Sequence, residues 1–144
     1  MPRVKHPGRV AIVSVVGLAC ATLLAVAIHS ADTRTDSRAL PAAIQSVSPS
    51  PGSDVPPQQP IAIDLQNELT GDITVCPPSS PCAPIPADQV DFVKGLGQLT
   101  FTPGPGKDIQ RYAPGLNKVT IDYRNQGDPN ANTGSYTWSF TVTA

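Results

Sequence analysis

The chain has 144 residues, a formal net charge of −1 and two histidines. That length allows one ordinary domain with short appendages. From Pro41 onward, nine acidic and five basic residues give a net charge of −4, and the basic residues do not cluster. A nucleic-acid-binding surface needs a basic cluster to neutralise phosphates, so no nucleic-acid partner is expected.

The first 28 residues form a basic tail and an apolar segment. Residues 1–9 contain Arg3, Lys5 and Arg9 and no acid, and residues 10–28 (VAIVSVVGLACATLLAVAI) contain no charge. As a helix rising ~1.5 Å per residue, the apolar segment would span roughly 28 Å, close to the ~30 Å hydrocarbon core of a bilayer. The basic flank favours a cytoplasmic N-terminus with the rest of the chain outside. The sequence therefore predicts a membrane contact through residues 10–28.

The same segment also fits an export signal that is removed. Residues 25–27 have the small-x-small form that a signal peptidase recognises, although the apolar stretch is longer than the about 7–15 residues usual for such signals. Two hypotheses follow. The chain is either a single-pass membrane protein with an uncleaved anchor, or it is cut near Ala27 and becomes secreted or periplasmic.

Residues 29–41 (HSADTRTDSRALP) are polar and mixed in charge, which is typical of a solvated linker. Residues 42–144 are predicted to form the folded domain. Fifteen of the seventeen prolines lie from Pro41 onward, in clusters that indicate turns. Short runs of alternating apolar and polar residues lie between the clusters, at 43–47, 61–66, 72–76, 89–93, 98–102, 118–124 and 135–143.

About seven short runs separated by turns predict an all-β fold, an antiparallel β-sandwich of two sheets. Residues 66–69 could form a single helical turn. The last run places its large side chains on one face and Thr or Ser on the other, which predicts a strand in the middle of a sheet. The expected core anchors are Tyr136, Trp138, Phe140 and Val142.

Two stretches carry a resemblance to a family. Residues 44–65 (IQSVSPSPGSDVPPQQPIAIDL) contain a strand, a Ser-Pro element, a Pro/Gly turn and a second strand, and residues 99–143 end in an aromatic-rich strand. In both parts the chain resembles bacterial Ig-like domains of surface-layer and other cell-surface proteins. The resemblance implies an Ig-like sandwich that acts as a spacer or as a protein-binding module towards an envelope or cell-surface partner.

The chain is also distantly similar to the periplasmic copper-resistance domain, a related sandwich with a similar opening. Copper in that family is held by histidines, sometimes with methionines. Here His6, His29 and Met1 all lie outside the predicted domain, so the resemblance does not carry copper binding over. A small periplasmic metal-handling domain remains the alternative function.

Cys76 and Cys82 lie six residues apart in CPPSSPC. Outside the cytoplasm a disulfide is the default interpretation, and the prolines between the two cysteines stiffen the loop. A redox pair needs closer spacing, and a zinc site needs two further ligands. The pair is therefore predicted to be a structural disulfide.

The segment DPNANTG places Asp128, Asn130 and Asn132 at alternate positions, as in a calcium-binding loop. An EF-hand loop needs Gly at its sixth position and Glu at its twelfth, and this sequence has neither. Asp, Asn and Gly are also the residues that a turn selects. A turn is the favoured interpretation, and calcium binding by these three residues is kept as a weaker hypothesis.

Histidine is missing from residues 42–144, so a Ser-His-Asp or Cys-His catalytic arrangement cannot form there. Paired carboxylates could hydrolyse glycosides, but the acids of the predicted domain are expected to be solvated surface residues. The glycines of KGLGQ and PGPGK lack the strand-to-helix context of a phosphate-binding loop. The sequence therefore predicts a protein that is not an enzyme and needs no cofactor.

Overall fold

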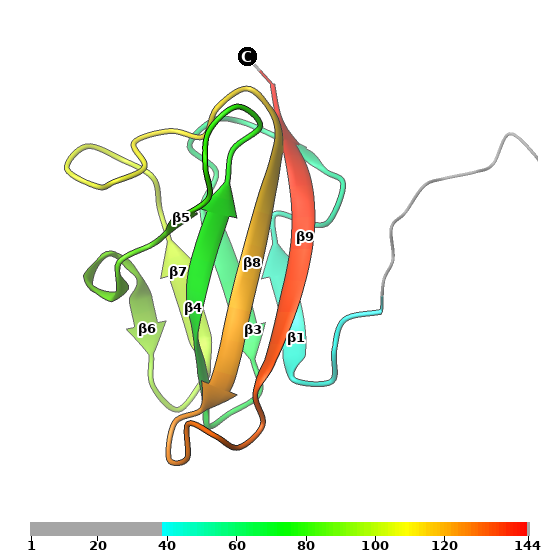
Figure 1. Cartoon of the computed structure of the whole chain (residues 1–144), viewed down its shortest axis with the longest axis vertical. Helices are drawn as coiled ribbons and strands as arrows, with labels where there is room; N and C mark the ends of the chain where they lie inside the picture. The colour runs from blue at the N-terminus through cyan, green and yellow to red at the C-terminus, as the bar shows by residue number, and fades with distance from the viewer. Residues whose placement is uncertain (1–38, 144) are drawn as a thin grey trace, which may run out of the picture. The chain divides into compact units, whose positions relative to one another are not determined.

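Two β-sheets pack face to face in the computed structural model, which describes residues 39–143 (Figure 1). Most elements coincide with the alternating runs of the sequence, since a half-buried strand needs apolar residues at every second position. The described elements are β1 (Ile44–Ser48), β2 (Asp54–Val55), β3 (Ile61–Leu65), β4 (Leu69–Cys76), β5 (Ala83–Pro84), the 3-10 helix η1 (Ala87–Gln89), β6 (Asp91–Val93), β7 (Gln98–Phe101), β8 (Gly115–Asn125) and β9 (Gly134–Val142).

The strands are ordered β1-β3-β7-β6 in one sheet and β2-β9-β8-β4-β5 in the other. This arrangement confirms the predicted all-β sandwich. Neighbouring strands run antiparallel with one exception: β2 pairs in parallel with the end of β9, Asp54 opposite Thr141 and Val55 opposite Val142. The prediction of a purely antiparallel fold is therefore wrong at this pair. The two-residue strands β2 and β5 were not predicted, because prolines follow or occupy them.

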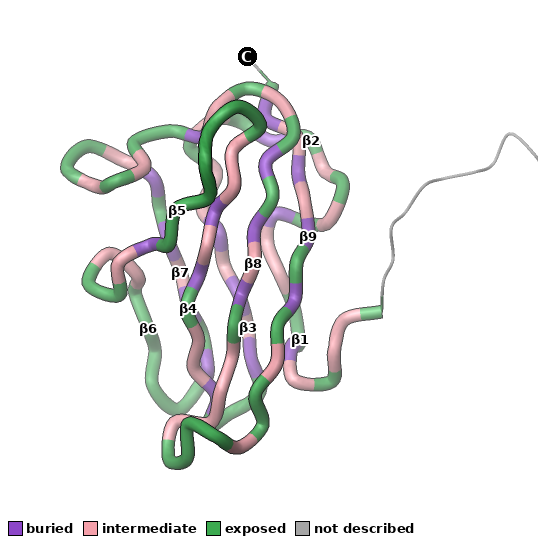
Figure 2. The backbone as a smooth tube through the Cα atoms, viewed as in Figure 1, coloured by how far each residue is buried: buried purple, intermediate pink, exposed green. Residues whose placement is uncertain are grey.

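The core lies between the two sheets and contains the inward-facing residues of β1, β2, β3, β4, β7, β8 and β9 (Figure 2). In β3, Ile61, Ile63 and Leu65 are buried, whereas Ala62 and Asp64 between them are partly exposed. Burial of one such aliphatic side chain contributes roughly 1.5–3 kcal/mol. The alternation of apolar and polar residues therefore also determines which face of each sheet packs against the other sheet.

Strand β9 lies between β2 and β8, and its four large side chains are all buried: Tyr136, Trp138, Phe140 and Val142. The ring of Tyr136 stacks on that of Trp138 with the centroids 5.8 Å apart. The outward-facing Thr137 forms a 2.8 Å hydrogen bond with Thr120 of β8. The aromatic stripe thus fills the space between the sheets, and the hydroxyl-bearing stripe faces the solvent.

The connection between β3 and β4 is a β-turn that carries the chain from one sheet to the other. The N–H of Leu69 donates to the carbonyl oxygen of Gln66 at 3.1 Å, and Glu68 has a φ of 74°. Glu68 is the third residue of this turn, and a positive φ at the third residue is typical of a β-turn and not of a helix. Residues 66–69 do not form the helical turn that the sequence left possible, because the strand pairing of Leu69 extends the backbone there.

The predicted tail and apolar segment, residues 1–28, lie outside the described residues, as does most of the predicted linker. Within residues 39–143, no helix is long and apolar enough to cross a bilayer. The choice between an anchor and a cleaved signal therefore stays a prediction from the sequence.

Candidate binding cleft

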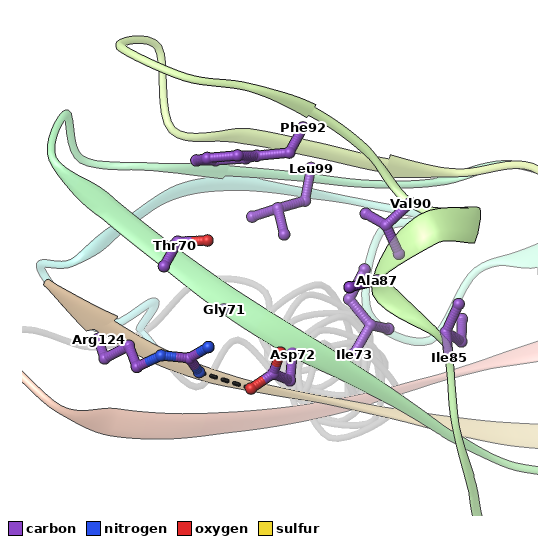
Figure 3. Close-up of a pocket in the computed structure, with 10 residues that line it drawn as sticks. All are labelled: Thr70, Gly71, Asp72, Ile73, Ile85, Ala87, Val90, Phe92, Leu99 and Arg124. Carbon is purple, nitrogen blue, oxygen red and sulfur yellow. Dashed lines mark hydrogen bonds and ion pairs between the residues drawn. The ribbon is translucent and has the colours of Figure 1, made fainter. Parts of the chain in front are cut away.

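A small cleft opens where strand β6 of one sheet approaches strand β4 of the other (Figure 3). Strand β6 is the last strand of its sheet, and β5 pairs with β4 only at Thr74 and Val75. The first half of β4 therefore has a strand on one side only. The cleft has a volume of about 230 Å³ and is lined by Thr70, Gly71, Asp72, Ile73, Ile85, Ala87, Val90, Phe92, Leu99 and Arg124.

The floor of the cleft is apolar, and one rim is charged. Ile73, Ile85 and Leu99 are buried beneath it, and Phe92 forms part of the opposite rim with 37% of its surface exposed. On the charged rim, the guanidinium of Arg124 donates to the carboxylate of Asp72 (Figure 3). That hydrogen bond and the charge of Asp72 raise the pKa of Arg124, so the guanidinium keeps its positive charge at any ordinary pH.

Gly71 determines the local shape of β4 beside the cleft. A Cβ atom at this position would lie 2.6 Å from Cδ1 of Ile121 and 2.7 Å from the carbonyl oxygen of Asp122. Ile121 thus occupies the space that a side chain of residue 71 would need. The glycine brings β4 and β8 close together and leaves no side chain of its own in the cleft.

Strand β6 exposes apolar residues next to the cleft. All three of its residues are exposed, including Phe92 and Val93, and Leu96 in the following turn is 55% exposed. Its backbone pairs with β7 on one side only. An edge strand with free N–H and C=O groups can accept a strand from another chain. The edge and the cleft together offer backbone hydrogen bonds and an apolar depression.

The predicted disulfide is present. Cys76 ends β4, Cys82 precedes β5, and their sulfurs are bonded at 2.03 Å. The bridge closes the CPPSSPC loop at one end of the sandwich. Neither cysteine lines the cleft.

The calcium candidates Asp128, Asn130 and Asn132 lie in the loop between β8 and β9. The loop uses its oxygens for its own backbone: Asn125 accepts from the N–H groups of Gly127 and Asp128, and Asp128 accepts from the N–H of Asn130 at 3.0 Å. Within residues 39–143, no group of three or more His, Cys, Asp or Glu side chains is placed to hold a metal ion. These contacts support the turn interpretation of DPNANTG.

No protein-family model matches the chain, and no curated protein is found to be its relative. The site is therefore interpreted from its own chemistry. Sequence reasoning missed the cleft, because its walls come from β4, β6, β7 and β8, and their adjacency is a property of the topology. Phe92 was included in a predicted strand, but the sequence does not indicate that this strand lies at the edge of its sheet.

Proposed function

We propose that the protein presents an Ig-like domain in the cell envelope and acts there as a non-catalytic protein-binding module. In this proposal residues 10–28 tether the domain to the membrane, or an export signal is cut near Ala27 and the domain is released. The single observation that carries the binding role is the free edge of β6, with Phe92 and Val93 exposed beside an apolar cleft.

The strand order supports the Ig-like assignment. Immunoglobulin-type sandwiches pair their first, second, fifth and fourth main strands in one sheet and the third, sixth and seventh in the other. With β2 and β5 taken as short additions, β1-β3-β7-β6 and β9-β8-β4 follow that order. Antibody domains join the two sheets by a disulfide between their second and sixth main strands. Here the disulfide lies within one loop, and the corresponding strands β3 and β8 bury Ile63 and Ile121 instead.

The proposed partner is an extended segment of another envelope protein. Such a segment would pair with the free backbone of β6 and place an apolar side chain in the cleft, against Ile73 and Leu99. An edge strand selects an extended partner because only extended backbone matches the spacing of its N–H and C=O groups. The apolar floor of the cleft then favours a partner segment whose side chain at that position is also apolar.

The test uses the full-length protein in its native cells, with a photo-crosslinking amino acid in place of Val93 or, as a matched control, of Leu116. Both side chains are exposed, Val93 on the edge strand β6 and Leu116 on β8, at 47% and 55%. We expect a discrete crosslinked protein from position 93 and none from position 116.

The crosslinked partner is then purified and its Kd measured. Val93→Asp should weaken binding about tenfold or more, because it places an unpaired charge in the apolar contact, and Leu116→Asp should leave the Kd unchanged. Equal crosslinking at both positions, or equal Kd values for the two variants, would contradict binding at β6 and leave a spacer role.

A further inference from the structure

The free edge of β6 is short, and the chain limits it on both sides. Before β6, the loop between β7 and β8 holds the 3-10 helix η1, because the ammonium group of Lys107 donates to the carbonyl oxygen of Gln89 at 3.2 Å. The side chain of Gln89 also donates to the carboxylate of Asp108 at 2.9 Å and accepts from its backbone N–H at 3.0 Å. After β6, the chain turns back into β7. A partner strand therefore has β6 itself, Asp91–Val93, to pair with.

Successive residues of β6 face opposite sides of its sheet. Phe92 lies opposite the buried Leu99 of β7, so its side chain is on the inner face and borders the cleft (Figure 3). Asp91 lies opposite Thr100, which is not buried, so its side chain is on the outer face, together with that of Val93. A strand added to the free edge follows the same alternation. Its residue opposite Phe92 enters the cleft, and the residues on either side of it lie on the outer face.

The strand residues on the outer face of the four-stranded sheet include acids and no base. Two rows of directly opposed residues cross this face: Asp91, Thr100, Ala62 and Ser48 in one, and Val93, Gln98, Asp64 and Ser46 in the other. Within residues 39–143, the one ion pair joins Asp72 and Arg124 of the other sheet. The exposed carboxylate of Asp91 therefore has no ion-pair partner in that part of the chain, and no strand residue of this face compensates its charge.

The charge along this edge changes sign from one end of β6 to the other. Asp91 is the first residue of the strand, Lys94 directly follows its last residue, and both are exposed. Between neighbouring strands, opposite charges directly across from each other are stabilising, and like charges are destabilising. A base in the partner is therefore favourable opposite Asp91 and unfavourable at the Lys94 end. The edge thus distinguishes the two ends of a segment that binds to it.

We propose, on the basis of the function proposed above, that the segment which pairs with β6 carries a lysine or an arginine opposite Asp91, directly beside the apolar residue that enters the cleft. The base compensates the charge of Asp91, and the acidic outer face of the sheet attracts it during approach. An acid at the same position would face Asp91 with a like charge. The partner is therefore recognised by two adjacent residues, an apolar one in the cleft and a basic one on the outer face.

The experiment selects segments that bind the full-length protein from a phage-displayed library of random peptides of about nine residues. Several copies of each peptide per particle make weak binding detectable. Segments that bind Phe92→Thr equally well are discarded, because this uncharged change keeps a residue suited to a strand and removes the ring beside the cleft. The selection is repeated on Asp91→Lys and on the matched control Asp54→Lys. Asp54 is an exposed residue of β2, an outermost strand of the other sheet.

We expect Lys or Arg beside a central apolar residue in the segments selected on the wild-type protein and on Asp54→Lys, and Asp or Glu at that position on Asp91→Lys. One selected segment is then made as a peptide with its base and as a second peptide with Glu in place of the base. The basic peptide should bind the wild-type protein about three- to tenfold more tightly than Asp91→Lys, and the Glu peptide should show the reverse order. Both differences should shrink at about 1 M salt, which screens exposed charges.

The proposal is overturned if segments that depend on Phe92 are selected but show no preference for a base. It is also overturned if Asp91→Lys and Asp54→Lys change the two Kd values equally. In either case β6 still binds an extended segment, and the proposed function stands. If no segment that depends on Phe92 is selected, strand addition at β6 is itself contradicted, and the proposed function and the basic partner residue are both rejected.

Discussion

Trp138 donates its indole N–H to the carbonyl oxygen of Pro49 at 3.0 Å, across 89 residues of sequence. Pro49 directly follows β1 of the four-stranded sheet, whereas Trp138 belongs to β9 of the five-stranded sheet. The indole therefore contributes to the core with its ring and joins the two sheets with its N–H. Trp138 is 4% exposed, so this hydrogen bond is shielded from water.

Replacing Trp138 with Phe should lower the free energy of unfolding by about 2–3 kcal/mol. The substitution leaves a cavity in the core and deprives the buried carbonyl of Pro49 of its donor. Urea denaturation of the full-length protein measures the change. Leu116→Ala, at an exposed position of β8, is the control and should stay within about 0.5 kcal/mol of the wild-type protein. Equal losses for both variants would contradict the role of the indole.

The disulfide should stabilise the domain modestly. Replacing Cys76 and Cys82 together with Ser removes a cross-link over a sequence separation of six, and the chain-entropy relation gives about 2 kcal/mol for so short a loop. Thermal unfolding of the double variant should show the corresponding fall in Tm. Wild-type protein treated with a reductant should match the variant. If Tm falls in the double variant but not in the reduced wild-type protein, the loss of stability comes from the serine side chains and not from the missing cross-link.

Gly71→Ala should destabilise the domain by about 1–3 kcal/mol, because the new Cβ atom would clash with Ile121 and with the backbone of Asp122. Gly104→Ala is the matched control. A Cβ atom there meets nothing within 4 Å, so the change should be neutral or slightly stabilising. Comparison of the two variants by chemical denaturation tests the close approach of β4 and β8. Similar stabilities would mean that the two strands lie further apart.

Tyr112 should make the stability of the domain depend on pH in the alkaline range. Burial raises the pKa of its phenol in the folded protein, above the ordinary value of about 10. The folded state then holds the proton more tightly than the unfolded state. The contribution of this proton to the free energy of unfolding is complete below pH ~10. It is lost as the pH rises above that value, by up to about 1.4 kcal/mol per pH unit.

Urea denaturation between neutral pH and the alkaline range measures this dependence. Tyr112→Phe should flatten the decline, whereas Tyr123→Phe should leave it as in the wild-type protein. A decline of the same steepness in all three proteins would assign it to other groups and contradict the burial of the phenol.

The alternation of apolar and polar residues was sufficient to predict the strands that build the core. The runs around Ile63, Ile121 and Trp138 each show a clear period of two, and a strand that covers another sheet needs that period. The disulfide was also predictable, since the spacing of Cys76 and Cys82 in a stiff loop depends on local sequence alone.

The remaining features depend on contacts between distant segments. Strand β2 exists because β9 lies beside it, and its own two residues, Asp54 and Val55, carry no periodic signal. Tyr112 and Asn117 lie in RYAPGLN, where no pattern indicates that both side chains point into the interior. The cleft likewise arises from strand order, which single-sequence patterns do not encode.

The two short outer strands of the five-stranded sheet have a consequence for aggregation. Pro56 follows β2 directly and Pro84 lies within β5, and proline has no N–H with which to extend a ladder. Both borders of that sheet are therefore protected against fibril-like growth. If copies of the protein associate edge to edge under stress, they should do so through the four-stranded sheet.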